Sequence, residues 1–222
     1  MSSPVIERPA PTRATTPTTE TPVVALKRRT IDSVLIGFGL VAVVVFAVAG
    51  ALLTWGSNFS DDYVHDELTS QNITFPSAER LTEEGRTDLL KYAGQNLDTG
   101  KEAEAYASYI NGHLELIAGG ATFADLGTPE RAAKGAVTAA IEAGEPQATI
   151  DELQATAGAI TGQRDSLFRG ETLRGLLLSA YAWSTVGTIA GLAAIGAFIA
   201  AAVMAVLVAL GMVHHRKLPT TA

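Results

Sequence analysis

The sequence predicts an all-α membrane protein in which two transmembrane helices flank an extracytoplasmic helical bundle. Two observations predict this class. Hydrophobic residues are concentrated in two blocks, 34–55 and 175–213, although charged residues make up an ordinary 18% of the 222-residue chain. Basic residues precede the first block and follow the second, whereas the segment between the blocks is acidic. This segregation is typical of membrane proteins.

The first block, VLIGFGLVAVVVFAVAGALLTW, is expected to form a transmembrane helix over 34–55. At about 1.5 Å per residue it covers roughly 33 Å, the thickness of one hydrocarbon core. A cleaved signal peptide is the alternative, because Ala47-Val48-Ala49 resembles a cleavage site that follows a basic stretch. The apolar run continues through Leu53 and exceeds the roughly 7–15 residues of a secretory core, which favours an uncleaved anchor.

The second block would extend roughly 58 Å as a helix, too long for one hydrocarbon core. It contains no proline, asparagine or charged residue that would favour a turn within lipid. One crossing is therefore expected, with 182–212 as its body. The preceding 175–181 would be an amphipathic segment near the outer membrane surface.

Charge predicts the orientation, because basic residues near the ends of a span stay in the cytoplasm. The segment 56–174 has 20 Asp or Glu against 9 Lys or Arg and is expected outside the plasma membrane. Trp55 and Trp183 would anchor the spans at the outer interface. The basic anchors at the two cytoplasmic ends are Lys27, Arg28, Arg29, Arg216 and Lys217.

The two ends of the chain carry no predicted domain. Residues 1–30 are rich in proline and threonine and are expected to be a disordered cytoplasmic tail, because they cannot bury enough apolar surface to offset chain entropy. Residues 213–222 would be a short basic cytoplasmic tail.

Helix signals recur in the outer segment, 56–174, whereas no convincing strand alternation competes with them. Thr99 with Glu102, and Thr149 with Glu152, have the spacing of a capping box. Pro129 lies where a first helical turn accepts proline. The expected helices cover residues 61–69, 78–95, 101–118, 129–143 and 149–168. The sequence leaves open whether the last of them continues into the second span.

Few residues of the outer segment indicate a catalytic or metal-binding site. The chain has no cysteine. Asp61 and His65 are four residues apart on one expected helix face and, with His113, are weak candidates for a metal site. A solvated acidic helix and a core histidine are the simpler interpretations. No phosphate loop, dinucleotide fingerprint or zinc spacing occurs, so no catalytic residue or cofactor is assigned and nucleic acid is not an expected partner.

The second span contains a pattern of small residues that permits a close helix crossing. The partner would be the first span, another membrane protein or a second copy of this chain, with the lipid bilayer around them. Neither span contains an ionisable residue, which leaves no candidate pathway for an ion. The small residues of the second span are Gly187, Gly191, Gly196 and Ala200.

The blocks LLTWGSNFSDDYVHDELTSQNITFP, GRTDLLKYAGQ and FRGETLRGLLLSAYAWSTVG resemble a family of two-span membrane proteins from actinobacteria. The resemblance extends from about Val34 to Arg216. It implies no established function, although members often carry the automatic name aromatic ring-opening dioxygenase. The iron-bearing subunit of such enzymes uses a histidine-rich site, which this sequence lacks, so no catalytic residue is transferred from the name.

Three classes of function therefore remain. A non-catalytic accessory or scaffold protein of a cell-envelope complex agrees best with the predicted architecture. An extracytoplasmic ligand-binding or sensing module is the alternative, but no cytoplasmic output domain is recognised. A non-haem iron dioxygenase is the third and has the least support from the residues.

Overall fold

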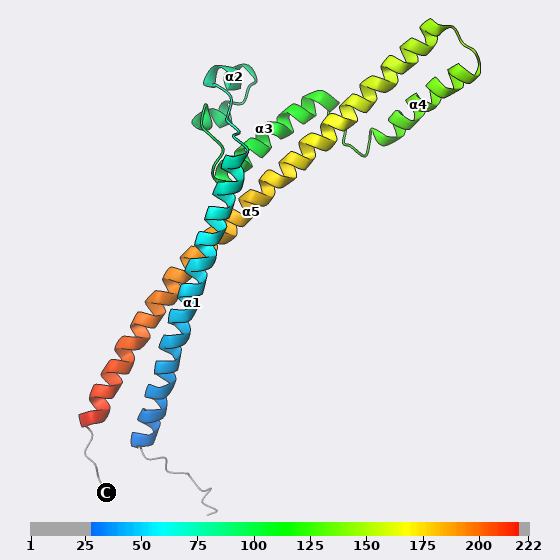
Figure 1. Ribbon diagram of the computed structural model, residues 1–222. Coiled ribbons are helices and arrows are strands. Elements are labelled where there is room, and N and C mark those ends of the chain that lie inside the picture. Colours follow the sequence, from blue (N-terminus) through cyan, green and yellow to red (C-terminus); the bar gives the residue numbers. More distant parts are fainter. Residues whose placement is uncertain (1–27, 218–222) are drawn as a thin grey trace, which may run out of the picture.

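The computed structural model describes residues 28–217, and within this range it is all helical, as predicted (Figure 1). One isolated antiparallel bridge, Thr74 to Asn96, is the sole β pairing among the described residues. The two longest helices are long and apolar enough to cross a membrane. The helices are α1 (Arg28–Ser70), α2 (Ala78–Glu83), the 3-10 helix η1 (Thr87–Tyr92), α3 (Gly100–Ala118), α4 (Gly127–Glu142) and α5 (Gln147–Lys217).

The first apolar block and the acidic segment that follows it form one helix, α1, rather than a span and a separate helix over 61–69. The polar residues after Trp55 do not interrupt the helix, because they pack against α5. Ser57 contacts Gly191, and the Ser60 hydroxyl donates a hydrogen bond to the carbonyl of Trp183 (2.6 Å). Asn72, in the left-handed region (φ 48°), lies just after the helix end.

The second apolar block belongs to α5, a helix of 71 residues. Proline is absent from 147–217, and Pro146 immediately precedes the helix. The expected helix over 149–168 therefore continues into the second span. Residues 175–181 are part of the same helix, with Leu177 3% exposed within the apolar core and Leu176 65% exposed, and their position near the outer membrane surface stays a prediction.

The helices α1 and α5 run antiparallel and pack along most of the length of α1 (Figure 1). Their contact positions recur every seven residues, the spacing of a left-handed coiled coil. On α5 the buried residues at this spacing are Gly187, Ala194, Ala201 and Val208. On α1 the corresponding buried or half-buried residues are Ile36, Val43, Gly50, Ser57 and Val64.

The segment expected to be one helix over 78–95 is two short elements. The Ser77 side chain caps α2, and Gly85 then adopts a left-handed conformation (φ 71°) that ends the helix. The chain continues as η1, which Arg86 ties to α3 by donating from Nη1 to the Ser108 carbonyl (2.9 Å). A left-handed turn suits glycine because other residues incur a steric penalty there.

The outer helices do not surround one shared core. An apolar core lies where α1, α3 and α5 meet, and α3 begins with the predicted capping box of Thr99 and Glu102. Among the described elements, α4 packs on α5 alone and forms a hairpin with it far from the α1 end (Figure 1). The core residues are Val64, Leu68, Phe75, Leu97, Ala103, Ala107 and Leu177.

Candidate functional site

The small residues predicted to mediate helix packing divide into two groups. A Cβ added to Gly187 would lie 3.0 Å from Ser60 Cβ, and one added to Gly191 would lie 2.9 Å from Ser57 Oγ. These two glycines therefore permit close contact with α1 in the same chain. Gly196 instead has open space at its Cβ position. Ala200 is half-buried beside the more buried Ala201.

Close approach also occurs deeper in the apolar part of α1. A Cβ on Gly39 would overlap Val208, and one on Gly50 would lie 2.9 Å from the Phe198 ring. The pattern of small residues on α5 did not reveal this part of the interface, because Val208 and Phe198 are large. The spacing of seven would have revealed it, since it joins Gly187, Ala194, Ala201 and Val208.

The two predicted interface tryptophans lie at different heights along the helix pair. The Trp183 carbonyl is level with Ser60, which follows Trp55 by five residues, or about 7.5 Å of helix. Both indoles are more than half exposed. The offset is close to the roughly 5–8 Å thickness of one interfacial layer, so their placement in one outer interface stays a prediction.

The predicted basic anchors lie at neighbouring helix ends. Arg28 and Arg29 begin α1, and Arg216 and Lys217 end α5. These ends lie side by side, since Gly211 approaches Ile36 (Figure 1). Lys27 lies outside the described residues, as do most of the N-terminal tail 1–30 and the last five residues of the C-terminal tail.

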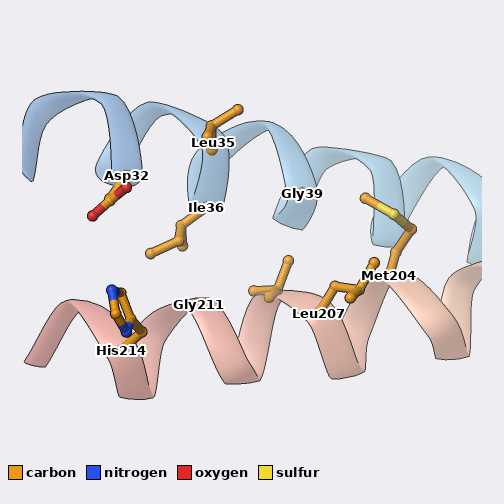
Figure 2. A pocket seen from close by; sticks show the side chains of 9 residues that line it. Asp32, Leu35, Ile36, Gly39, Met204, Leu207, Gly211 and His214 are labelled. Carbon is orange, nitrogen blue, oxygen red and sulfur yellow. The ribbon is translucent and has the colours of Figure 1, made fainter. Parts of the chain in front are cut away.

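A crevice of about 240 Å³ separates α1 and α5 near these basic ends. Figure 2 shows Asp32 and His214 directed toward one another across it, with apolar residues along the rest of its length. Asp32 Oδ2 is buried and accepts no hydrogen bond from the described residues. The apolar lining consists of Leu35, Ile36, Gly39, Met204, Leu207, Val208 and Gly211.

The weak metal candidates do not come together. His65 Nδ1 lies 3.3 Å from the Asp98 carbonyl, at the start of α3, and Asp61 lies against Gly187. His113 lies roughly 20 Å further along α3 and contacts the Tyr109 carbonyl (Nδ1 to O, 3.2 Å). Within 28–217, no three His, Cys, Asp or Glu side chains form a group that could hold a metal ion.

The carboxyl groups beside His65 cap α3. Glu102 accepts hydrogen bonds from the backbone of Asp98 (3.1 Å) and Thr99 (2.9 Å). Burial raises the pKa of Glu102, but these and other hydrogen bonds outweigh burial and lower it overall. The hydrogen bond with Glu102 raises the pKa of Asp98. Their role in this arrangement is to anchor the start of α3 against α1.

A buried carboxylate, which the sequence did not single out, joins α4 to α5. Glu130 accepts from Lys134 Nζ (2.6 Å), Arg164 Nη1 (2.6 Å) and the Thr161 hydroxyl (3.0 Å). These hydrogen bonds lower the pKa of Glu130 to about 2, the one to Lys134 having the largest effect. The Arg164 guanidinium also lies over the Phe123 ring, 4.0 Å from its centroid. The network holds α4 against α5.

A second hollow, the outer groove, lies between α1 and α5 beyond Trp55. It has a volume of about 280 Å³ and a mainly apolar lining. The α1 residues of the groove are Tyr63, Val64, Glu67, Leu68 and Gln71. The α5 residues are Leu173, Leu176, Leu177, Ser179, Ala180 and Trp183, and Ile73, which follows α1, also lines the groove.

No known protein family, curated protein or solved structure matches the chain. The geometry of the helix pair and of its outer groove therefore carries the functional argument.

Proposed function

We propose that the protein is a non-catalytic integral membrane protein that presents an extracytoplasmic helical domain as an accessory or scaffold component of a cell-envelope complex. In this proposal, α1 crosses the plasma membrane over 34–55 and α5 crosses it toward its C-terminal end. Both chain termini are cytoplasmic. The acidic segment 56–174 lies outside.

One observation carries the proposal. The exposed surface of the helix pair is apolar over the two apolar blocks and polar further along the pair. Over the apolar blocks, small residues such as Gly39, Gly50 and Ala194 face the partner helix, while large residues such as Phe38 and Leu192 are exposed. Further out, Val64, Leu68 and other apolar side chains are buried and acidic residues are exposed. Lipid is the solvent that suits the first arrangement, and water suits the second.

The continuity of the two helices supports a scaffolding role. Contacts at a spacing of seven extend from Ile36, near the basic helix ends, to Val64 in the outer core. A coiled-coil pair of this kind resists bending, so the outer domain would keep one orientation relative to the bilayer. A fixed orientation is useful for holding a partner at a defined height.

Topology labelling tests this proposal. Because the sequence has no cysteine, an introduced cysteine is the only thiol that the reagent can label. Single variants Glu145→Cys, between α4 and α5, and Thr220→Cys, near the C-terminus, are treated with a membrane-impermeant maleimide. In intact cells we expect labelling of the Glu145→Cys variant alone, and in disrupted cells labelling of both. Labelling of Thr220→Cys alone in intact cells, or release of the chain as a soluble protein, would refute the proposal.

A further inference from the structure

We infer that the outer groove is a docking surface for a basic amphipathic helix of another membrane protein. The inference rests on the proposed function, because it places the groove outside the bilayer and beside the point where α1 emerges. It adds the surface that is used and the chemistry of the partner.

The groove is an exposed apolar surface that begins at Trp183, at the predicted outer interface, and in the proposed topology extends away from the bilayer. Leu176 is 65% exposed, Trp183 51% and Tyr63 49%. Tyr63 and Gln71 follow Trp55 by 8 and 16 residues, so the groove lies about 12–24 Å beyond Trp55 along α1. Contiguous apolar surface exposed to water commonly marks an interaction site.

The shape of the groove suits a helix. It lies where α1 and α5 meet, and α3 already packs on another flank of α5, with Gly100 against Tyr181 and Ser184. No residue of α3 lines the groove. From 173 to 183 on α5 the groove is about 15 Å long, which three turns of helix would fill. Side chains of a helix seated there would pack between the side-chain ridges of α1 and α5.

Charge identifies the partner as basic. Glu67 lines the groove, and Asp66 lies one helical turn from Tyr63 on the adjoining flank of α1. Neither carboxylate forms an ion pair within residues 28–217, and the sequence has no Lys or Arg between 56 and 79. Lysine or arginine on the partner would complement them.

The position of the groove identifies the partner as a membrane protein. Trp55, Phe59 and Tyr63 stack along α1, with ring centroids 5.7 and 6.2 Å apart, and form an exposed stripe from the first span to the groove. A helix that leaves the bilayer beside α1 would follow this stripe. A symmetric dimer through the same face would instead bring two sets of carboxylates onto one interface.

The test uses the full chain in phosphatidylcholine nanodiscs and a fluorescent 18-residue leucine–lysine amphipathic helix as the probe. We expect saturable binding that weakens when salt is raised. Leu176→Lys should weaken it about tenfold or more, because a leucine contact is lost. The matched control is Leu116→Lys, at a position that is 82% exposed on α3, and it should bind like the wild type.

Charge is tested separately. A double variant, Asp66→Asn and Glu67→Gln, should weaken probe binding at low salt. The control double at the start of α5 is Asp151→Asn and Glu152→Gln, and should leave binding unchanged. Circular dichroism should show the same helix content for every variant. Equal binding of a leucine–glutamate helix of the same length, or equal effects of the two double variants, would overturn the inference.

Two further results would assign the groove to another occupant and overturn the inference. The first is a disulfide-linked homodimer of Leu176→Cys with no equivalent for Leu116→Cys, which would indicate a second copy. The second is quenching of Trp183 by chain-brominated lipid in a Trp55→Phe background, which would indicate an acyl chain. If topology labelling succeeds while the probe fails to bind, the docking surface is refuted and the proposed membrane architecture stands.

Discussion

The two ends of α5 are held by different physical interactions. Toward its C-terminus α5 packs on α1 and α3 through small and apolar residues, among them Gly187, Ala194 and Leu177. Toward its N-terminus it packs on α4, where Glu130 and Ala140 are the buried residues of α4. An apolar interface thus holds one end of α5, and an alanine-rich interface with one carboxylate network holds the other.

Because of this difference, the two interfaces of α5 should lose stability under different changes. Apolar packing is weakened by cavities and by added bulk, but it does not depend on the protonation of one group. The α4–α5 hairpin depends on the ionised form of Glu130, because Arg164 and Lys134 bind the carboxylate. The hairpin should therefore open in acid while the α1–α5 pair persists. Four predictions test the comparison.

The largest effect is expected in the apolar core. Leu97 is 1% exposed, so Leu97→Ala should lower the free energy of unfolding of the outer core by about 2–5 kcal/mol. Amide hydrogen exchange of α3 measures this, and protection of α4 should not change. Leu116→Ala is the control on the exposed face of α3. Equal loss of protection in α3 and α4 would show that the two ends of α5 are one cooperative unit.

The helix interface should be the next most sensitive. Gly187→Ile and Gly191→Ile add bulk where α1 lies in contact, and each should destabilise the helix pair by about 1–3 kcal/mol. Thermal unfolding in mild detergent, followed by circular dichroism, provides the measurement. Gly196→Ile adds the same bulk to open space and should have little effect. Unchanged stability of all three variants would remove the interface assignment.

Acid should affect the hairpin selectively. The folded-state pKa of Glu130 is about 2, below the ordinary glutamate value of 4.5, so its contribution to stability is present above about pH 4.5 and is lost as pH falls toward 2. Spin labels on Thr138→Cys and Thr156→Cys should report a separation of α4 from α5 over that range. In Glu130→Gln the hairpin should be looser at neutral pH, with less acid dependence. A hairpin that is unaffected at pH 2 would contradict the role of Glu130.

The smallest effect is expected where the apolar part of α1 meets its polar part. Ser60→Ala removes the hydrogen bond to the Trp183 carbonyl and should cost about 0.5–1.5 kcal/mol. Trp183 fluorescence during thermal unfolding, in a Trp55→Phe background, reports this change. Ser179→Ala is a matched serine substitution elsewhere on the outer part of the pair. A larger loss for Ser179→Ala would mean that the Ser60 bond does not align α1 with α5.

Local patterns predicted several features of the fold. The capping box of Thr99 and Glu102 marked the start of α3, because its signal lies within four consecutive residues. The second proposed box, at Thr149, is wrong. Helix α5 begins earlier, at Gln147, after Pro146. A single helix over 78–95 is also wrong, because Gly85 takes a left-handed conformation that helical periodicity does not reveal.

The candidate sites were less predictable. Gly187 and Gly191 were found as contact residues because small residues four apart form a local pattern, whereas Gly196 fits that pattern and faces open space. Glu130 was not identified, because its partner Arg164 is 34 residues away in sequence. The outer groove was missed for the same reason, since its two walls come from helices more than 100 residues apart.

The helical class, the two apolar blocks and the contrast between basic ends and an acidic middle could be predicted from the sequence, because composition and hydrophobic periodicity are local properties. The continuation of both apolar helices far beyond their apolar blocks depends on long-range packing. The Ser57–Ser60 region stays helical because α5 packs against it, and 175–191 stays helical because α1 and α3 cover it. Those contacts join residues far apart in the sequence, such as Ser60 with Gly187 and Gly100 with Ser184, and chain folding alone brings them together.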